Sequence, residues 1–356
     1  MRIPSRAILL AWCATTLASA AELRWVDAST LRIEGRGWKE TKAPFDRLPA
    51  KASGVVRGQV YSLGRDAAGI AIHFTSDTPT LAVRWKLRRE RLAMSHMAAT
   101  GVSGVDLYAR IGDAWRWVGV GRPEKFPLNE VTLFKGQAAQ SREFLLYLPL
   151  YNGIEQLELG VAGPATVTAA AVDPRRPIVV YGTSAVQGGC ASRPGMAYPA
   201  ILGRRLGWPT LNLGFSGNGK AEPEMAALLA ELDAAIYVID CVPNLEPGEV
   251  TRVEPFVRTL RDRHPATPIL LIENLAYPDG VLVQERRDRY VAANRTLREI
   301  YERLRTTDSQ LHYLEATRLL DPENEGTVDG NHPTDLGFTR MADALTPILR
   351  GMLARQ

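Results

Sequence analysis

The chain changes its pattern once, at residues 172–177 (VDPRRP), and this change limits the folds open to it. Before this segment, apolar residues alternate with small or polar ones, as at Ile70, Ile72 and Phe74. Such alternation predicts strands with one buried face. After it, short apolar runs alternate with helical stretches, which predicts a parallel sheet flanked by helices. We therefore expect a β domain over 21–174 and an α/β domain over 175–356.

The first half predicts an antiparallel sandwich of the jelly-roll kind. Further alternating runs lie at 81–85, 115–120, 144–150 and 157–161, and no long helical period interrupts them. Five tryptophans fall in this half, at positions 25, 38, 85, 115 and 117. Exposed aromatic rings can stack on sugars, although core packing is the commoner use of such side chains.

In the second half, strands and helices are expected in strict alternation. The predicted strands are 177–182, 210–215, 234–241, 268–275 and 311–316, and the predicted helices are 196–206, 222–232, 248–263, 283–305 and 335–353. The carboxyl ends of parallel strands meet at one edge of a sheet, and ligands bind outside that edge. We therefore expect the functional residues to follow the strands.

The first twenty residues carry the pattern of a signal peptide. Arg2 and Arg6 precede an apolar stretch from Ala7 to Leu17, no acidic residue is present, and small residues end the segment at Ala20. The apolar stretch is too short to span a membrane. We expect cleavage after Ala20 and a periplasmic or secreted protein without a membrane span.

Composition argues against two classes of partner. The 43 Lys and Arg residues nearly balance the 39 Asp and Glu residues, so a nucleic-acid partner is not expected. The five histidines are scattered, and the spacing of the cysteines matches no zinc pattern. We expect no cofactor and no metal, and the sequence leaves the oligomeric state open.

Three short segments, 181–184, 212–217 and 329–332, together nominate a nucleophile, an oxyanion hole and a base. Ser184 follows the apolar run 177–181 and opens a glycine-rich turn. A serine hydroxyl needs a base, and His332, just before the last predicted helix, is the candidate. Asp329 lies three residues before His332, close enough to hold the imidazole tautomer. Each segment alone would be ordinary turn sequence, but the set predicts a Ser184–His332–Asp329 triad.

Acyl transfer also needs hydrogen-bond donors for the oxyanion. The backbone N–H of Ser184 can supply one, and Gly217, after the second predicted strand, can supply another. Asn244 follows the third predicted strand, so its side-chain amide can be a third donor. A loop glycine and a turn asparagine are the structural alternatives for these two positions.

These residues resemble the four sequence blocks of the SGNH (GDSL-type) hydrolases, on Ser184, Gly217, Asn244 and the pair Asp329 and His332. The chain has Gly-Thr-Ser where that family commonly has Gly-Asp-Ser, and Val-Pro-Asn-Leu where it commonly has Gly-x-Asn-Asp. The segment 104–108 (GVDLY) is similar to the signature of an N-terminal β domain in one bacterial subgroup. The runs 148–153 and 188–195 resemble that subgroup too. The resemblance implies a flavodoxin-like catalytic domain behind a β-sandwich.

The combined prediction is a secreted serine esterase that acts on a small-molecule or oligosaccharide ester through an acyl-enzyme, with O-acetyl groups on carbohydrate as the first choice. A lipase or lysophospholipase, and a non-catalytic carbohydrate-binding protein on a hydrolase scaffold, are the alternatives.

Two further positions are left with alternatives. Arg193 is predicted to contact the substrate from a loop over the crevice, with a structural salt bridge, for example to Asp240, as the alternative. Cys190 and Cys241 follow strands that are neighbours in a flavodoxin-like order, so they form either a disulfide or two separate buried thiols.

Overall fold

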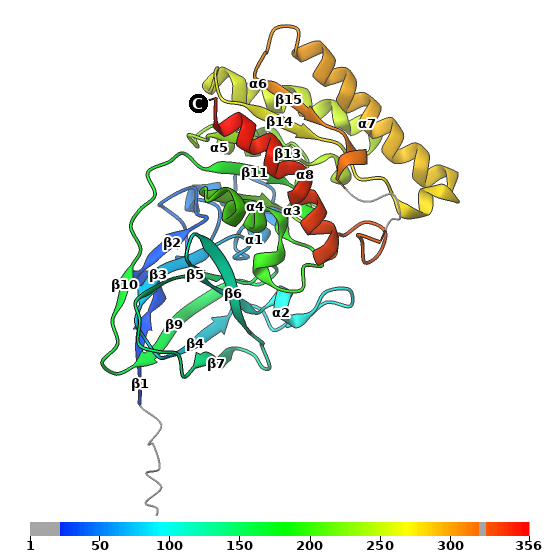
Figure 1. The fold of residues 1–356 in the computed structure, drawn as a ribbon. Helices are drawn as coiled ribbons and strands as arrows, with labels where there is room; N and C mark the ends of the chain where they lie inside the picture. The colour runs from blue at the N-terminus through cyan, green and yellow to red at the C-terminus, as the bar shows by residue number, and fades with distance from the viewer. Residues whose placement is uncertain (1–21, 320–324, 356) are drawn as a thin grey trace, which may run out of the picture.

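The computed structural model describes residues 22–319 and 325–355, which fold into a β-rich half and an α/β half (Figure 1). The predicted signal peptide and its cleavage site lie outside the described residues. The strands of the β-rich half are β1 (Leu23–Asp27), β2 (Arg32–Glu34), β3 (Ala71–Ser76), β4 (Thr80–Leu87), β5 (Val105–Ile111), β6 (Ala114–Gly121), β7 (Leu128–Lys135), β8 (Arg142–Tyr147), β9 (Ile154–Ala162) and β10 (Val167–Ala169).

These strands form two antiparallel sheets with one core between them. One sheet has the order β1-β9-β4-β7, and the other has the order β10-β3-β8-β5-β6, with β2 paired to β3. The alternating residues Ile72 and Phe74 of one sheet and Val83 and Trp85 of the other are fully buried in this core. Trp85 also donates its indole N–H to the carbonyl of Ser103 at 3.0 Å. The predicted β-sandwich is thus confirmed.

The α/β half contains a five-stranded parallel sheet in the order β12-β11-β13-β14-β15. The strands are β11 (Ile178–Gly182), β12 (Thr210–Gly214), β13 (Ile236–Asp240), β14 (Ile269–Ile272) and β15 (Leu311–Leu314). This is the flavodoxin-like order, in which the chain reverses its winding direction beside β11. The predicted fold class is therefore correct.

Helices cover both faces of the parallel sheet. In chain order the helices are α1 (Gly58–Gly64), α2 (Ala99–Val102), α3 (Ser184–Gln187), α4 (Tyr198–Leu206), α5 (Pro223–Leu229), α6 (Val253–Arg263), α7 (Gln284–Leu304) and α8 (Asp335–Leu353). Helices α5, α6 and α7 pack on one face, and α4 and α8 pack on the other. None of the helices in the described part of the chain combines the length and apolar character that a membrane crossing requires.

Cys190 and Cys241 are free thiols, so the disulfide between them is ruled out. Their strands are indeed neighbours, because β11 pairs with β13. Cys190 packs in the core on the α4 and α8 side, whereas Cys241 packs in the core on the α5 to α7 side. The sheet separates the two sulfur atoms, and the alternative of separate buried thiols is the correct one.

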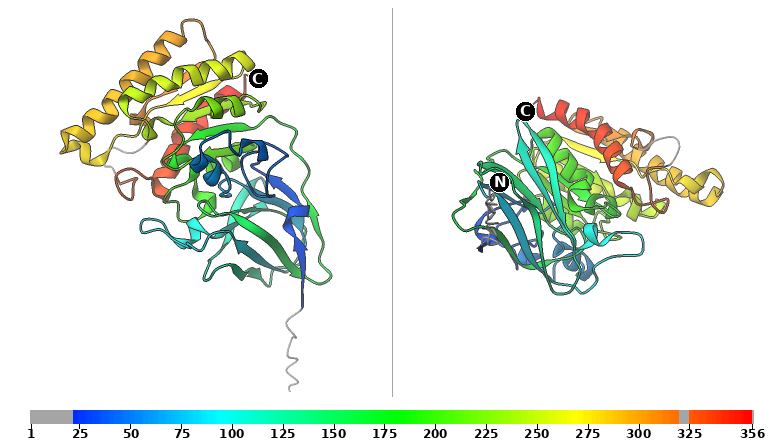
Figure 2. Two further views of the ribbon diagram at one scale, coloured as in Figure 1. Left: turned by 180° about the vertical axis from the view of Figure 1, so that it is seen from behind. Right: turned by 60° about the horizontal axis from the view of Figure 1, so that its bottom comes forward.

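One segment of the β-rich half, residues 36–66, packs on the α/β half. Its side chains Leu48, Ala52 and Val60 belong to the same core as the α5 to α7 face of the parallel sheet. The guanidinium of Arg47 is fully buried and donates to the carbonyls of Asn212 at 3.0 Å and Gly214 at 2.8 Å on β12. The left view of Figure 2 shows this blue segment at the junction of the halves.

Candidate active site

Ser184 is the first residue of α3, two residues after the end of β11. The preceding Thr183 caps the helix, since its hydroxyl accepts a hydrogen bond from the N–H of Ala185 at 3.3 Å. Gly182 allows the strand to end there, because a Cβ on this residue would lie 1.9 Å from the carbonyl oxygen of Asp240. Ser184 is 8% exposed, at the carboxyl edge of the sheet.

Asp329 and His332 form the predicted pair in the turn before α8. The Asp329 Oδ2 atom lies 2.8 Å from Nδ1 of His332, and Oδ1 accepts the backbone N–H groups of Asn331 and His332. Burial by itself raises the pKa of Asp329, but the hydrogen bonds from His332 and Asn331 bring it below its usual value. The carboxylate is therefore ionised near neutral pH and fixes the ring with Nε2 directed away from it.

Gly189 lies close to both Ser184 and the His332 ring. Its N–H donates to the carbonyl oxygen of Ser184 at 2.7 Å. A Cβ on Gly189 would lie 3.2 Å from the His332 ring and 3.2 Å from the same oxygen. No hydrogen bond joins the Ser184 hydroxyl to His332 within residues 22–319 and 325–355. Such bonds commonly tighten only when substrate is bound.

Asn244 ends a short 3₁₀ helix after β13 and packs against the turn 215–219. In the amide orientation that satisfies both of its ends, its carbonyl oxygen accepts from the N–H groups of Asn218 at 3.1 Å and Gly219 at 3.2 Å. Asn244 and Ser184 line the same cavity. Gly217 belongs to the same turn and has a positive φ of 67°. The structure thus gathers the predicted oxyanion donors at one edge of the sheet.

The cavity at Ser184 is small, about 20 Å³. Its walls include the polar residues Asp240, Asn274 and Asn331 and the apolar residues Leu275, Leu319 and Met341. Burial raises the pKa of Asp240 to about 6, although a hydrogen bond from the Tyr198 hydroxyl at 2.9 Å acts in the opposite direction. The site therefore holds a carboxyl group that charges only near neutral pH.

Arg193 makes a salt bridge, but its partner is not the one named from the sequence. Its Nη1 atom lies 2.8 Å from Oδ2 of Asp106 and 2.6 Å from the Tyr108 hydroxyl. Asp106 also accepts the N–H groups of Gly195 at 2.8 Å and Trp117 at 2.7 Å, while Asp240 pairs with Tyr198 instead. The aspartate and tyrosine of the GVDLY segment thus hold the loop after the nucleophile, and a contact of Arg193 with substrate stays a prediction.

Residues of the β-rich half that sequence reasoning did not single out also surround the nucleophile. The Tyr151 hydroxyl lies 3.5 Å from the carbonyl oxygen of Ser184. Gln187 of α3 is fixed by the carbonyl of Leu150 at 2.9 Å and by the N–H of Ser216 at 2.9 Å. The His96 ring lies 5.4 Å from the His332 ring, centre to centre. The segment 148–153 belongs to a run that resembles the GxDLY subgroup, whereas His96 belongs to no motif in the sequence.

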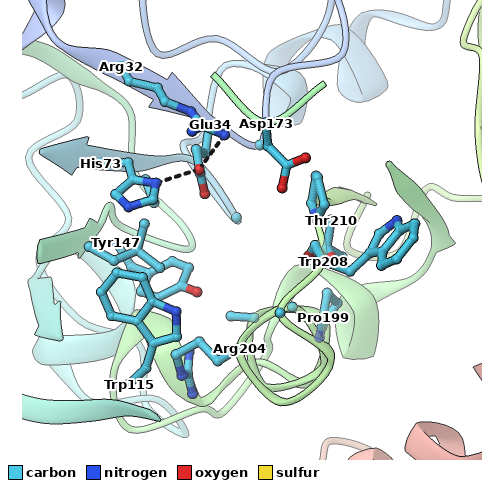
Figure 3. A pocket seen from close by; sticks show the side chains of 18 of the residues that line it. Arg32, Glu34, His73, Trp115, Tyr147, Asp173, Pro199, Arg204, Trp208 and Thr210 are labelled. Carbon is cyan, nitrogen blue, oxygen red and sulfur yellow. Dashed lines mark hydrogen bonds and ion pairs between the residues drawn. The ribbon is translucent and has the colours of Figure 1, made fainter. Parts of the chain in front are cut away.

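A much larger cavity, of about 460 Å³, lies away from these residues (Figure 3). It opens between α4, the start of β12 and the sheet that contains β3 and β8, with His73, Tyr147 and Trp115 on one side and Trp208 and Thr210 on the other. Glu34 and Glu143 each lie 2.6 Å from the His73 ring. Among the described residues that line it there is no serine or cysteine, and it lies at the amino end of β12, so the predicted nucleophile belongs to the smaller cavity at Ser184.

Comparison with known proteins gives two family matches. The model of the GDSL-like lipase/acylhydrolase family matches residues 175–350. The model of the GxDLY domain, the N-terminus of SGNH hydrolase-type esterases, matches residues 23–167. No curated protein matches the chain. The first match covers the α/β half, and the second covers the β-rich half.

Solved structures extend these matches. A protein from Bacteroides ovatus described as a GDSL-like lipase is 37% identical, with a TM-score of 0.89 over 93% of this chain and 98% of its own. A salicylyl-acyltransferase from a tetracycline biosynthetic pathway (19% identity, TM-score 0.74, 93% and 97% covered) shares the fold. A family two carbohydrate esterase from Cellvibrio japonicus shares it as well, with 15% identity and a TM-score of 0.60 over 94% of this chain and 99% of its own. The chain belongs to the GDSL-like lipase/acylhydrolase family of SGNH esterases, in the group with an N-terminal GxDLY domain.

Proposed function

We propose that this esterase removes acetyl groups from acetylated carbohydrate. The observation that carries the proposal is the size of the cavity beside Ser184, about 20 Å³. A cavity needs roughly 10–15 Å³ to hold one water molecule, so this one has room for a group of one or two heavy atoms. An acetyl methyl group fits such a space, and an octanoyl chain does not.

In the proposed reaction, Ser184 Oγ attacks the ester carbonyl carbon while Nε2 of His332 takes its proton. Asp329 holds the ring through Nδ1 and stabilises the imidazolium. The N–H groups of Ser184 and Gly217 and the amide of Asn244 stabilise the negative oxygen of the tetrahedral intermediate. His332 then protonates the departing sugar hydroxyl. Water, activated by the same histidine, releases acetate and restores the serine.

The carbohydrate part of the proposal draws on neighbours of the same fold. The Cellvibrio japonicus structure is a family two carbohydrate esterase. Another neighbour, from Butyrivibrio proteoclasticus, is an acetyl xylan esterase (13% identity, TM-score 0.58, 93% and 100% covered). The signal-peptide pattern of the first twenty residues adds to this, because a periplasmic or secreted enzyme meets polysaccharide.

A lipase is the second candidate, because the Bacteroides ovatus relative at 37% identity is described as a GDSL-like lipase. A lipase needs an apolar channel for its acyl chain. In this chain the large apolar side chains of Leu275, Leu319 and Met341 are among those that line the cavity beside Ser184. These side chains would have to move apart to admit a long acyl chain.

The test is acyl-chain selectivity measured with the purified protein. Hydrolysis of p-nitrophenyl acetate and p-nitrophenyl octanoate is compared with acetate release from acetylated xylo- and manno-oligosaccharides. We expect kcat/KM on the acetate to exceed that on the octanoate at least tenfold, and acetate to be released from at least one oligosaccharide. A preference for octanoate would support the lipase. Hydrolysis of the synthetic acetate alone would refute the carbohydrate part, and turnover of none of the substrates would leave a non-catalytic carbohydrate-binding protein.

A further inference from the structure

Three side chains with metal-binding atoms meet beside the predicted base. One nitrogen of His96, the sulfur of Cys190 and one nitrogen of His332 lie within 4.8 Å of one another. They come from three distant segments: the loop between β4 and α2, the loop after α3, and the turn before α8. Imidazole nitrogen and thiolate sulfur are the ligands that zinc prefers in proteins. We propose that these three residues form a Zn²⁺ site and that the bound ion reversibly inhibits the esterase.

His332 is already oriented as zinc-binding histidines usually are. Its Nδ1 atom faces Oδ2 of Asp329 at 2.8 Å, so Nε2 is the nitrogen available to an ion. Zinc ligands of this kind commonly donate their second ring N–H to a carboxylate, which fixes the ring and strengthens the ligand. In the proposed reaction the same Nε2 takes the proton of Ser184, and the inhibitory part of the inference rests on that proposed function. An ion on Nε2 leaves no base for the serine.

The unusual backbone conformation of Cys190 supports a functional role for its side chain. Cys190 has a φ of 74°, in the left-handed region that residues other than glycine rarely adopt. Strained conformations of this kind cluster at functional sites. The thiol is buried and has no disulfide partner. A coordinating ion has to displace the proton of this thiol.

The three ligand atoms are near enough for one ion to draw them together. Zinc lies about 2.0–2.1 Å from nitrogen and about 2.3 Å from sulfur, so at tetrahedral angles two ligand atoms of one ion lie roughly 3.3–3.6 Å apart. The observed limit of 4.8 Å therefore calls for an inward shift of at most about 1.5 Å. His96 is exposed on a loop, and this side chain can make that shift. Three protein ligands leave a fourth position for water, as in other open zinc sites.

The experiment measures inhibition and metal binding separately on the full chain after treatment with EDTA. Zn²⁺ is titrated against p-nitrophenyl acetate hydrolysis, and Co²⁺ is titrated without substrate while the thiolate-to-cobalt absorption band is recorded. His96→Ala is the main variant, Cys190→Ser removes the thiolate, and His312→Ala is the control at a distant strand. We expect zinc to inhibit the wild type and EDTA to restore activity. Whatever its basal turnover, His96→Ala should need at least about tenfold more zinc for half-maximal inhibition, in line with the 10–100-fold losses known even for groups that only hydrogen-bond to the ligands.

Each outcome decides the proposal. A cobalt–thiolate band in the wild type that is absent in Cys190→Ser supports the site, even if the chain hydrolyses no ester and the proposed function fails. Equal zinc sensitivity of the wild type and His96→Ala, or the absence of any thiolate band, would overturn it. Loss of zinc sensitivity in His312→Ala would show that the ion acts elsewhere.

Discussion

The two ends of the parallel sheet carry cavities of opposite character. At the carboxyl end of β11 and β13, the cavity beside Ser184 measures about 20 Å³. At the amino end of β12, the cavity beside Trp208 measures about 460 Å³ and is lined by ion-paired and aromatic side chains. Of the two, the smaller one is lined by Ser184, the predicted nucleophile, by Asn244, a predicted oxyanion donor, and by Asn331, the neighbour of His332. In an open α/β sheet, chain direction is thus a better guide to the chemistry than volume.

The largest expected effect comes from Ser184→Ala. This change should lower kcat on p-nitrophenyl acetate by about 10⁴ to 10⁶, since the attacking hydroxyl is lost, with little change in melting temperature. Ser216→Ala, on the neighbouring turn, is the matched control and should stay within about tenfold of the wild type. Comparable turnover by Ser184→Ala and the wild type would remove this serine from the mechanism and reopen the choice between the two cavities.

Changes in the histidine–aspartate pair should come next. His332→Ala should approach the loss of Ser184→Ala, while Asp329→Asn should lose roughly one to two orders of magnitude less, because members of one catalytic unit do not contribute additively. Steady-state kinetics with melting temperatures would measure this ranking. Full activity of His332→Ala would show that another group acts as the base.

The salt bridge under the loop at the carboxyl edge should govern stability more than substrate choice. Asp106→Ala leaves Arg193, the buried N–H of Gly195 and the indole N–H of Trp117 without this acceptor, and losing one partner of a buried ion pair typically costs about 3–5 kcal/mol. Asp106→Asn, which keeps an acceptor, should cost less; urea unfolding measures both.

Arg193→Ala tests whether the same salt bridge also serves the substrate. It should lower turnover of a synthetic acetate and of an acetylated oligosaccharide equally, with a lower melting temperature. A loss confined to the oligosaccharide would instead show that Arg193 contacts the sugar.

Asp240 should make stability depend on pH. Its pKa in the folded protein is about 6, above the 3.8 of the free side chain, so the folded state binds the proton more tightly. Stability is therefore highest when Asp240 is protonated and falls as the pH rises from about 4 to 7. Each pKa unit is worth 1.36 kcal/mol, so the wild type should lose about 3 kcal/mol relative to Asp240→Asn over this range. If the stability of the wild type and that of Asp240→Asn changed equally with pH, the Asp240 carboxyl would be solvated. Asp233→Asn, which removes an exposed carboxylate, is the control.

The smallest effect is expected at the large cavity. Trp115→Ala and Trp208→Ala should each leave p-nitrophenyl acetate hydrolysis within about twofold of the wild type, because both side chains lie at the opposite end of the strands. A more than tenfold loss of hydrolysis with an unchanged melting temperature would contradict the contrast drawn between the two ends of the sheet.

The parallel sheet could be predicted closely because its signals are local. The five predicted strands each contain one of β11 to β15, and the helices expected at 196–206, 222–232, 283–305 and 335–353 contain α4, α5, α7 and α8. The helix expected at 248–263 begins as a 3₁₀ turn and becomes α6 at Val253. A buried strand is a continuous apolar run, and residues that follow such runs collect at one edge. Ser184 and Asn244 could therefore be placed together from the sequence.

The remaining features depend on contacts between distant residues. Nothing local pairs Arg193 with Asp106, 87 residues earlier, or brings His96 to His332. The disulfide prediction used the correct strand order, but strand order does not say on which face of the sheet a side chain beyond the strand end will pack. Residues 36–66 adopt short elements, with α1 only seven residues long, so they show no period that would indicate packing on the second half.

The buried Arg47 has a consequence for the order in which the protein matures. Its acceptors on β12, Asn212 and Gly214, are synthesised some 165 residues later, and Leu48 and Val60 likewise await the core they enter. Domains emerging from the ribosome generally fold in sequence order. Here the first half leaves the ribosome with a charged group and apolar side chains still uncovered, so its final stability arrives only when the second half has been made.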